Sequence, residues 1–350
     1  MLNSELYLAD LNKIHSVIKN IKELNNKSIF ITGATGLIGS AIVDYLIYII
    51  KHKNYKINIT VGVRSISSAN IRFGKYIEEC GIACIKYDAT KPTALNGCFD
   101  FIIHAASPAT PSEYVNNPVD TMLANFVGIN SILEYAVKSK NTKKVLYISS
   151  SEVYGIKSDC KPYSEREYGY LDILNNRACY PSSKRAAETL CVSYANQYGI
   201  DVSIVRPGHI YGPTATNKDV RASSQFFSDV LSGKNIVMKS KGEQIRSYCY
   251  VLDCVSSVFT VLLNGQTRVA YNISNPNSVC SIYELAGCIA KHSGKQVVCE
   301  EATDKEKSGY NLMNNSSLDS SLIEALGWVG LFDLNSGVAH TLKILKHIWN

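Results

Sequence analysis

The chain has 350 residues, of which 46% are hydrophobic and 19% charged, and its formal net charge at pH 7 is +6. This length exceeds that of one compact domain, so we expect a large α/β domain with a smaller one attached. The lysines are scattered rather than gathered in a dense basic stripe with aromatic residues, which argues against nucleic-acid binding.

Eleven cysteines fall singly through the chain, no C-x-x-C pair occurs, and Cys80 and Cys84 have no histidine partner at ligand spacing. We therefore expect free thiols, no metal site and a reducing, cytoplasmic location. The longest apolar run, 42–50, contains an aspartate and is too short to span a bilayer. The N-terminus lacks the basic start and apolar core of a signal peptide, so no membrane partner is expected.

Residues 1–26 precede the first predicted strand. They carry apolar side chains at spacings of three and four, namely Tyr7, Leu11, Ile14, Ile18 and Ile21. This periodicity predicts an amphipathic helical extension with lysines on its other face. Its apolar stripe needs a partner surface, either the neighbouring domain or a second subunit.

From residue 27 onward, short apolar strands alternate with helical stretches. The predicted strands are 29–32, 57–63, 83–87, 101–104, 145–149, 202–206 and 270–273. This alternation is typical of an α/β fold with a doubly wound parallel Rossmann sheet. Ligands of such sheets bind at the carboxyl ends of the strands.

The first strand runs into three glycines with the spacing G-x-x-G-x-x-G. Gly33 permits a sharp turn, Gly36 removes a side chain where a pyrophosphate would approach, and Gly39 lets the next helix pack closely. A tight turn that binds nothing is the alternative. The residues expected to line a dinucleotide here are Gly33, Thr35, Gly36, Leu37, Ile38 and Gly39.

The end of strand 57–63 bears on the choice of nicotinamide cofactor. NAD-binding proteins usually place an acidic residue there for the ribose hydroxyls, whereas this chain has Arg64. A guanidinium suits a ribose phosphate, so among the NAD(P) cofactors NADP(H) is favoured. The alternative is that Arg64 stacks on the adenine of NAD.

Tyr180 and Lys184 are four residues apart and would share one helix face. An ammonium group beside a phenol lowers the pKa of the phenol, so Tyr180 could exchange a proton with a substrate hydroxyl near neutral pH. Ser150, at the end of strand 145–149, could hold the same oxygen. A core tyrosine beside a solvated lysine is the alternative, but the order of glycine turn, serine and Tyr-Lys pair favours catalysis.

In this order the motifs resemble those of the extended short-chain dehydrogenase/reductase family, which includes nucleotide-sugar epimerases, dehydratases, decarboxylases and 4-ketoreductases. The resemblance runs from about residue 27 to the C-terminus. It implies an enzyme that binds NAD(P) and acts at C4 of the sugar in a nucleotide-diphosphate sugar. Further motifs that carry it are Asp88-Ala89, His104-Ala105-Ala106-Ser107, Asn125, Ser151-Glu152, Arg206-Pro207-Gly208 and Arg246.

The resemblance also implies roles for individual residues. The catalytic group would be Ser150, Tyr180, Lys184 and Glu152. The cofactor would contact, besides the glycine turn, Arg64, Asp88, Ala89, Ala105, Ala106, Ser107, Asn125, Tyr180, Lys184 and Pro207. The substrate would contact Ser107, Ser151, Glu152, His209, Arg221 and Arg246. His209 replaces an asparagine that touches the sugar in relatives, and a buried core histidine is its alternative role.

Three parts are expected along the chain: the extension 1–26, a nucleotide-binding domain, and a smaller, mostly C-terminal substrate lobe. The domain would comprise 27–205 and about 247–275, and the lobe about 206–246 and 276–350, with helices near 223–231, 281–293, 318–326 and 336–349. Relatives pair the helices that correspond to 125–137 and 182–198, so a homodimer is expected. The apolar positions proposed for that contact are Leu133, Val137, Ala187, Leu190 and Tyr194.

The reaction type is the least determined feature. Ser151-Glu152 and Arg177-Ala178-Cys179-Tyr180 resemble UDP-glucuronate decarboxylases, but those enzymes carry a basic residue where this chain reads Asn311–Ser317. Together with Arg64 this favours a 4-keto nucleotide-sugar reductase, or a related epimerase/dehydratase, of surface-polysaccharide synthesis, with no carbon dioxide expected from UDP-glucuronate. A decarboxylase is the alternative, and a non-catalytic cofactor-binding scaffold is an alternative of another class.

Overall fold

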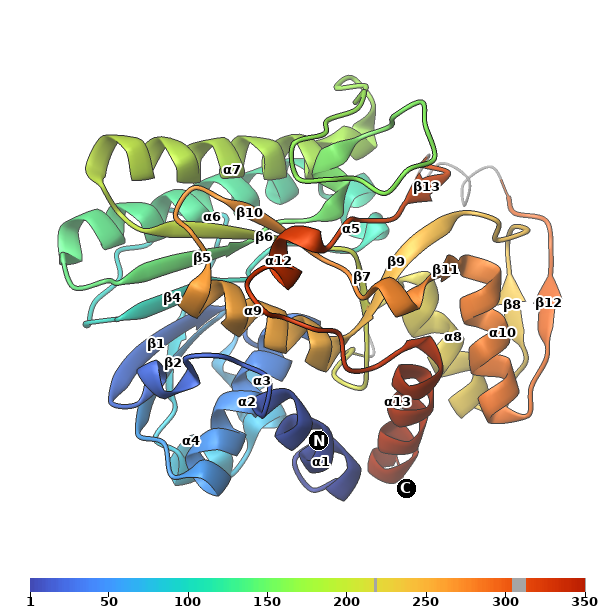
Figure 1. Cartoon of the computed structure of the whole chain (residues 1–350), viewed down its shortest axis with the longest axis horizontal. Helices are drawn as coiled ribbons and strands as arrows, with labels where there is room; N and C mark the ends of the chain where they lie inside the picture. Colours follow the sequence, from blue (N-terminus) through green and yellow to red (C-terminus); the bar gives the residue numbers. More distant parts are fainter. Residues whose placement is uncertain (217–218, 304–312, 350) are drawn as a thin grey trace.

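A seven-stranded parallel sheet forms the centre of the computed structural model, which describes residues 1–216, 219–303 and 313–349 (Figure 1). The strand order is β10-β6-β5-β4-β1-β2-β3. The strands are β1 (Lys27–Thr32), β2 (Ile57–Val63), β3 (Ala83–Lys86), β4 (Phe101–His104), β5 (Lys144–Ile148), β6 (Val202–Pro207) and β10 (Ala270–Ile273). The order reverses between β1 and β4, where ligands of doubly wound sheets bind.

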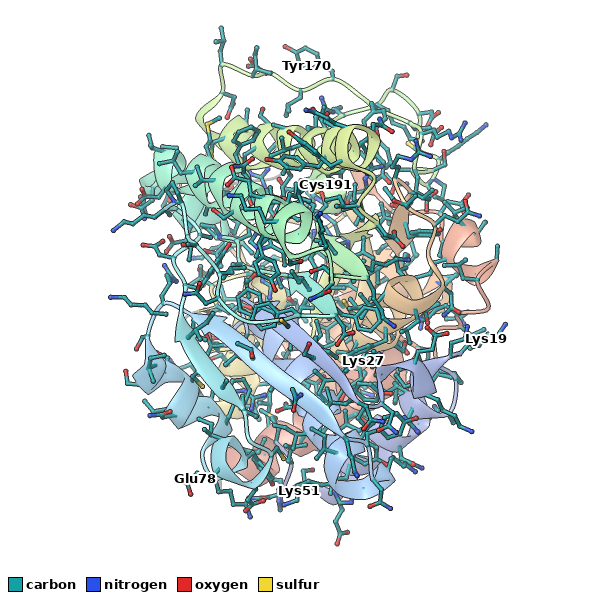
Figure 2. All side chains as sticks on the ribbon, turned by 90° about the vertical axis from the view of Figure 1, so that its left-hand side faces the viewer. Lys19, Lys27, Lys51, Glu78, Tyr170 and Cys191 are labelled. Atoms are coloured by element: carbon teal, nitrogen blue, oxygen red, sulfur yellow. The ribbon has the colours of Figure 1, made fainter. Side chains whose placement is uncertain are left out.

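Helices cover both faces of this sheet, so the predicted doubly wound fold is confirmed. One face carries α6 (Pro118–Ser139) and α7 (Cys179–Tyr198), and the other carries α2 (Leu37–Lys53), α3 (Ile66–Phe73) and α9 (Val251–Asn264). Side chains alternate along the strands: Phe30 belongs to the apolar core beneath α6 and α7, while Ile29 and Ile31 belong to the core on the opposite face. Figure 2 labels Cys191 on α7, which packs into the first of these cores.

A smaller lobe lies at the right of Figure 1 and is built around a second sheet of order β11-β9-β13, with β7 paired to β9. Its elements are β7 (His209–Tyr211), α8 (Ala222–Leu231), β8 (Ile236–Met238), β9 (Ile245–Tyr250), β11 (Val279–Ser281), α10 (Ile282–Ser293), β12 (Val297–Cys299), β13 (Asn315–Ser316) and α13 (Leu334–Trp349). The second part of the nucleotide-binding domain was expected to begin at about residue 247. Because β9 belongs to the second sheet, the chain returns to the large sheet only with α9, which begins at Val251.

The N-terminal segment differs from its prediction. The helix α1 (Glu5–His15) ends before Ile18, and a short 3-10 helix, η1 (Ile21–Leu24), follows. The apolar stripe is buried against α2, α9 and α13. Two carboxylates fix this packing: Tyr7 donates to Asp44 (3.0 Å) and Tyr250 donates to Asp10 (3.1 Å). The stripe therefore covers the chain's own two lobes.

The helix predicted over 318–326 is also wrong in extent, because only α12 (Ser321–Glu324) forms there. Leu318 is instead buried beside Tyr163 and Val153. The remaining short elements are α4 (Tyr76–Glu79), α5 (Pro111–Asn116), η2 (Ser151–Tyr154), η3 (Asn176–Ala178) and η4 (Pro276–Ser278). No helix within the described ranges is long and apolar enough to cross a membrane.

Candidate active site at the carboxyl ends of the strands

The glycine turn between β1 and α2 forms a tight backbone cradle. Gly33 has φ +65°, and a Cβ atom there would lie 2.5 Å from the carbonyl oxygen of Ala105. A Cβ atom at Gly39 would overlap the carbonyl of Gly33. At Gly36, in contrast, the only described atom within 4 Å of a Cβ, apart from Gly36 and its two chain neighbours, would be the Gly33 carbonyl oxygen, at 3.4 Å. The absence of a side chain at Gly36 therefore suits a ligand that approaches the N-terminus of α2.

The other residues expected around the cofactor lie at neighbouring strand ends. The amide groups of Ala105 and Ala106 both donate to Thr32 Oγ1 at 3.2 Å. Asn125, fully buried on α6, donates to Ser183 Oγ at 3.0 Å, and its Oδ1 has no hydrogen-bond partner among the described residues. The positions that surround this group are Thr35, Leu37 and Ile38 at the start of α2, Ala89 packed against Gly128, Ser107 donating to the carbonyl of Pro108, and Pro207 at the end of β6.

Arg64 and Asp88 lie at the ends of β2 and β3, away from the catalytic group. Arg64 is exposed. Asp88 accepts hydrogen bonds from the Thr90 hydroxyl (2.8 Å) and amide (3.1 Å), which hold the pKa of its carboxyl below the usual range. The resemblance implies that Asp88 contacts the cofactor, and in the structure its Oδ1 is engaged in a turn with Thr90.

Ser150, Tyr180 and Lys184 are brought together where β5 meets α7. Tyr180 and Lys184 are buried, with exposures of 6% and 2%. Lys184 Nζ donates to the carbonyl of Ile148 (2.8 Å) and lies 5.8 Å from the centroid of the Tyr180 ring. Ser150 hydrogen-bonds Tyr180 and also caps η2, since its Oγ accepts from the amide of Glu152 at 3.2 Å.

The predicted lowering of the Tyr180 pKa is wrong for this environment. Burial raises the pKa of Tyr180 to about 12, and the hydrogen bond from Ser150 offsets only part of that effect. Burial also lowers the pKa of Lys184 to about 7, because the charged ammonium loses its hydration. The four-residue spacing indicates only the mutual effect of the two groups, whereas loss of hydration is the largest cause of both pKa shifts.

Glu152 makes a bidentate ion pair with Arg177, which lies on η3 just before α7. The two oxygens of Glu152 accept from Arg177 Nη1 (2.9 Å) and Nη2 (2.7 Å). Arg177 Nε is buried and has no hydrogen-bond partner among the described residues. Charge-assisted, bidentate geometry fixes the orientation of Glu152, which immediately follows Ser151.

His209 lies on β7 within an electropositive environment. Burial, followed by the charges of Arg246, Arg221 and Arg177, lowers the pKa of His209 to about 3, so it is neutral. Its Nδ1 is buried and unpaired within the described part of the chain. Arg246 donates to the carbonyls of Ile245 (2.9 Å) and Met313 (2.8 Å).

Arg221 has a carboxylate partner that the sequence did not suggest. Its Nε and Nη2 donate to Asp219, at 2.9 and 2.5 Å. Two of its five N–H donors are therefore engaged, which leaves fewer donors for the diphosphate than predicted.

Two further residues of this site were missed from the sequence. The Tyr114 ring, on α5, stacks on Tyr180 with a centroid distance of 4.4 Å and an interplanar angle of 14°. Arg177 was noted only as part of a motif. The segment around Tyr114 has no periodicity, so nothing local indicates that it folds over the catalytic tyrosine.

Comparison with known proteins gives a consistent family. The NAD dependent epimerase/dehydratase family matches residues 29–274. UDP-glucuronic acid decarboxylase 6 of Arabidopsis thaliana is 34% identical over 316 residues, covering 90% of this chain and 87% of that protein. UDP-glucuronic acid decarboxylase 1 of Xenopus tropicalis is 28% identical over 331 residues, covering 94% and 74%.

Solved structures share the fold at lower identity. The UDP-glucose 4-epimerase of Thermotoga maritima superposes with a TM-score of 0.77 at 20% identity, covering 92% of this chain and 100% of that one. A dTDP-glucose 4,6-dehydratase of Streptomyces venezuelae gives 0.78 at 21% identity, covering 91% and 97%.

Proposed function

Because the chain belongs to the NAD-dependent epimerase/dehydratase family, we propose that this enzyme oxidises a nucleotide-linked hexuronic acid, such as UDP-glucuronic acid, at C4 and removes its carboxylate. The observation that carries the proposal is the Glu152–Arg177 pair beside Tyr180, in surroundings that also hold Arg221 and Arg246. A non-catalytic scaffold would have no need of this group.

Arginines of other segments supply the positive charge that the stretch Asn311–Ser317 lacks. The sequence favoured a reductase because no basic residue occurs in Asn311–Ser317, of which Asn311 and Leu312 lie outside the described residues. Arg177 Nε is a buried donor with no hydrogen-bond partner in the described ranges. A buried anion without a cation costs several kcal/mol, so the nearby arginines favour a carboxylated sugar.

The chemistry requires a group that accepts the proton of the C4 hydroxyl, and hydrogen-bond donors that stabilise negative charge on the C4 oxygen. A bound nicotinamide would supply the hydride acceptor, and the glycine cradle with the α2 N-terminus fits its pyrophosphate. Tyr180, ionised when the positive charge of a bound nicotinamide lowers its pKa, would take the proton of the C4 hydroxyl, while Ser150 hydrogen-bonds it. The resulting ketone makes the sugar a β-keto acid, which loses carbon dioxide as the electrons of the C5–C6 bond move toward the C4 oxygen. Ser150 and Tyr180 would hydrogen-bond that oxygen. The enolate would then take a proton at C5, and return of the hydride to C4, with the proton held by Tyr180 going to the C4 oxygen, would give the pentose and regenerate NAD.

Product analysis tests this function. The purified enzyme, incubated with UDP-glucuronate and a catalytic amount of NAD, should release one carbon dioxide for each nucleotide-linked pentose formed, as measured by mass spectrometry and trapped gas. The proposal is contradicted if no carbon dioxide forms while a nucleotide-linked 4-keto-6-deoxy sugar is reduced at the expense of NADPH.

That contrary result describes the second candidate, a 4-keto nucleotide-sugar reductase, and Arg64 is the observation in its favour. A reductase draws hydride from a metabolic pool, for which a phosphate-binding cation at the end of β2 is suited. Surface-polysaccharide synthesis and a cytoplasmic location remain predictions from the sequence.

Arg64→Asp should shift cofactor preference from NADP(H) toward NAD(H). The substitution removes the guanidinium and introduces a carboxylate that repels a ribose phosphate but accepts from ribose hydroxyls. Titration with NADPH and NADH, followed by fluorescence, measures the ratio of affinities. Arg268→Asp is the matched control, because Arg268 contacts Asn196 near the opposite edge of the sheet. An unchanged ratio in Arg64→Asp would show that Arg64 does not contact the phosphate.

We also propose that the enzyme is a homodimer joined through α6 and α7, although the contact differs from the one first predicted. Leu133 and Ala187 are buried in the chain's own core, so they leave no surface for a partner. The exposed apolar residues on α6 follow helical spacing instead: Val119, Met122, Leu123 and Phe126. This stripe supports a second copy as the partner.

Phe126→Asp should shift the protein from dimer to monomer, because it places a charge in the middle of the apolar stripe. Light scattering at micromolar concentration measures the mass. Ile71→Asp is the control, since Ile71 is an exposed apolar residue on α3, on the other side of the sheet. A wild-type protein of monomer mass would contradict the dimer.

A further inference from the structure

Arg185, one residue after Lys184 on α7, bonds to main-chain carbonyls of two other segments. Its Nε donates to the carbonyl of Val153 at 2.6 Å. Its Nη2 donates to the carbonyls of Tyr154 (3.1 Å) and Gly169 (3.2 Å). The guanidinium thus joins the helix that carries Tyr180 and Lys184 to η2 and to the loop beyond it.

The carbonyls of Val153 and Tyr154 are the last ones of the η2 turn. Terminal carbonyls of a helical turn have no partner within the turn and carry partial negative charge, so a cation is a favourable partner. Ser150 Oγ caps the other end of the turn through the amide of Glu152. The turn that presents Ser151 and Glu152 is therefore fixed at both ends.

The loop after η2 is shaped around the same guanidinium. Gly155 has φ +70°, and a Cβ atom there would lie 2.5 Å from the Tyr170 carbonyl oxygen and 3.1 Å from Arg185 Nη2. The amide of Gly169 donates to the carbonyl of Tyr154 at 2.6 Å. Tyr170 itself points outward, at the upper edge of Figure 2. Glycines at 155 and 169 thus allow the loop to close onto Arg185.

Glu152 is consequently held by two arginines, one on α7 and one on the η3 turn before it. Arg177, just before α7, binds its side chain, and Arg185, two turns further along, binds the main chain of its turn. Tyr180 and Lys184 lie between these two arginines. The relative position of Glu152 and Tyr180 is therefore set by contacts with α7 and with the η3 turn that leads directly into it.

We propose that Arg185 is a positioning residue that holds the Ser150–Glu152 turn in register with Tyr180. This inference rests on the function proposed above for the same site. Arg185 does not itself contact the substrate. A displacement of about 1 Å between reacting groups costs up to about a hundredfold in rate, so loss of this contact affects turnover more than binding.

Arg185→Ala tests the proposal through kinetics. The kcat of this variant for UDP-glucuronate should fall about ten- to a hundredfold relative to the wild type, while KM changes less than about threefold. Added guanidinium ion should restore part of kcat by occupying the space left behind. Arg185→Lys keeps the charge but cannot fork to separate carbonyls, so its kcat should be intermediate. Arg268→Ala is the matched control, an arginine that contacts α7 outside the site.

Amide hydrogen exchange supplies a readout that does not depend on the substrate. In Arg185→Ala the amides of residues 151–156 should exchange faster, while those of the glycine turn and of the centre of α7 keep their wild-type rates. Wild-type kcat with wild-type exchange at 151–156 would overturn the proposal, as would faster exchange throughout the fold. If the alanine variant does not fold, the kcat of Arg185→Lys and its amide exchange at 151–156 test the proposal instead. Failure of the wild type to decarboxylate UDP-glucuronate would overturn the proposed function and leave the exchange test standing.

Discussion

Replacing Tyr180 by phenylalanine should lower kcat at least about a hundredfold, since general acid–base catalysis contributes 10² to 10⁴. The affinity for NAD should change little, because the ring remains buried and stacked on Tyr114 while only the hydroxyl bonded to Ser150 is lost. Steady-state turnover of UDP-glucuronate and a fluorescence titration with NAD measure the two quantities separately.

Tyr147→Phe is the matched control for this experiment. Tyr147 is a buried tyrosine whose ring centroid lies 4.7 Å from Lys184 Nζ, and its hydroxyl has no hydrogen-bond partner in the described part of the chain. Its loss should leave kcat near the wild-type value. Lys184→Ala should weaken both turnover and NAD binding. Near-normal turnover in Tyr180→Phe would rule out the catalytic role of this tyrosine.

Arg177→Met should lower kcat/KM for UDP-glucuronate at least about a hundredfold, in line with the cost of truncating one member of a buried charge pair. The change leaves the Glu152 carboxylate without its partner in the same site as an anionic sugar. Both the lost attraction and the new repulsion act against binding and turnover. Decarboxylation measured over a range of substrate concentrations gives the ratio.

A double-mutant cycle separates this effect from general damage. In the Glu152→Gln background, Arg177→Met should cost less than in the wild type, because no charge is left unpaired. The kcat/KM of Arg177→Lys should lie between those of the wild type and Arg177→Met, since an ammonium cannot make the bidentate contact. Fully additive losses from the two substitutions would show that the pair does not act as a unit.

The fold could be read from the sequence wherever a local pattern repeats. Strands 57–63, 101–104 and 270–273 have the predicted bounds because their apolar runs are bordered by polar turns. Patterns failed where tertiary packing replaced local periodicity. Ile18 continues the apolar spacing but lies beyond the end of α1, and Leu318 packs against Tyr163 rather than within a helix.

The candidate site divides in the same way. The glycine cradle is a local feature of consecutive residues, so its geometry follows from the sequence. The pairing of Glu152 with Arg177 and the stacking of Tyr114 on Tyr180 join residues far apart in the chain, and no spacing indicates them. The direction of the Tyr180 pKa could not be predicted either, because it depends on burial. The roles of the individual site residues remain predictions until variants are measured.

The most direct test of the central claim is a single-turnover experiment with the purified enzyme, equimolar NAD and UDP-glucuronate. Near-ultraviolet absorbance follows reduced nicotinamide while trapped gas follows carbon dioxide. The account predicts a transient rise in absorbance that precedes carbon dioxide release and is slowed by deuterium at C4 of the sugar. The contradicting result is the absence of both the absorbance change and carbon dioxide, together with oxidation of NADPH when a nucleotide-linked 4-keto sugar is supplied. That result would identify a reductase.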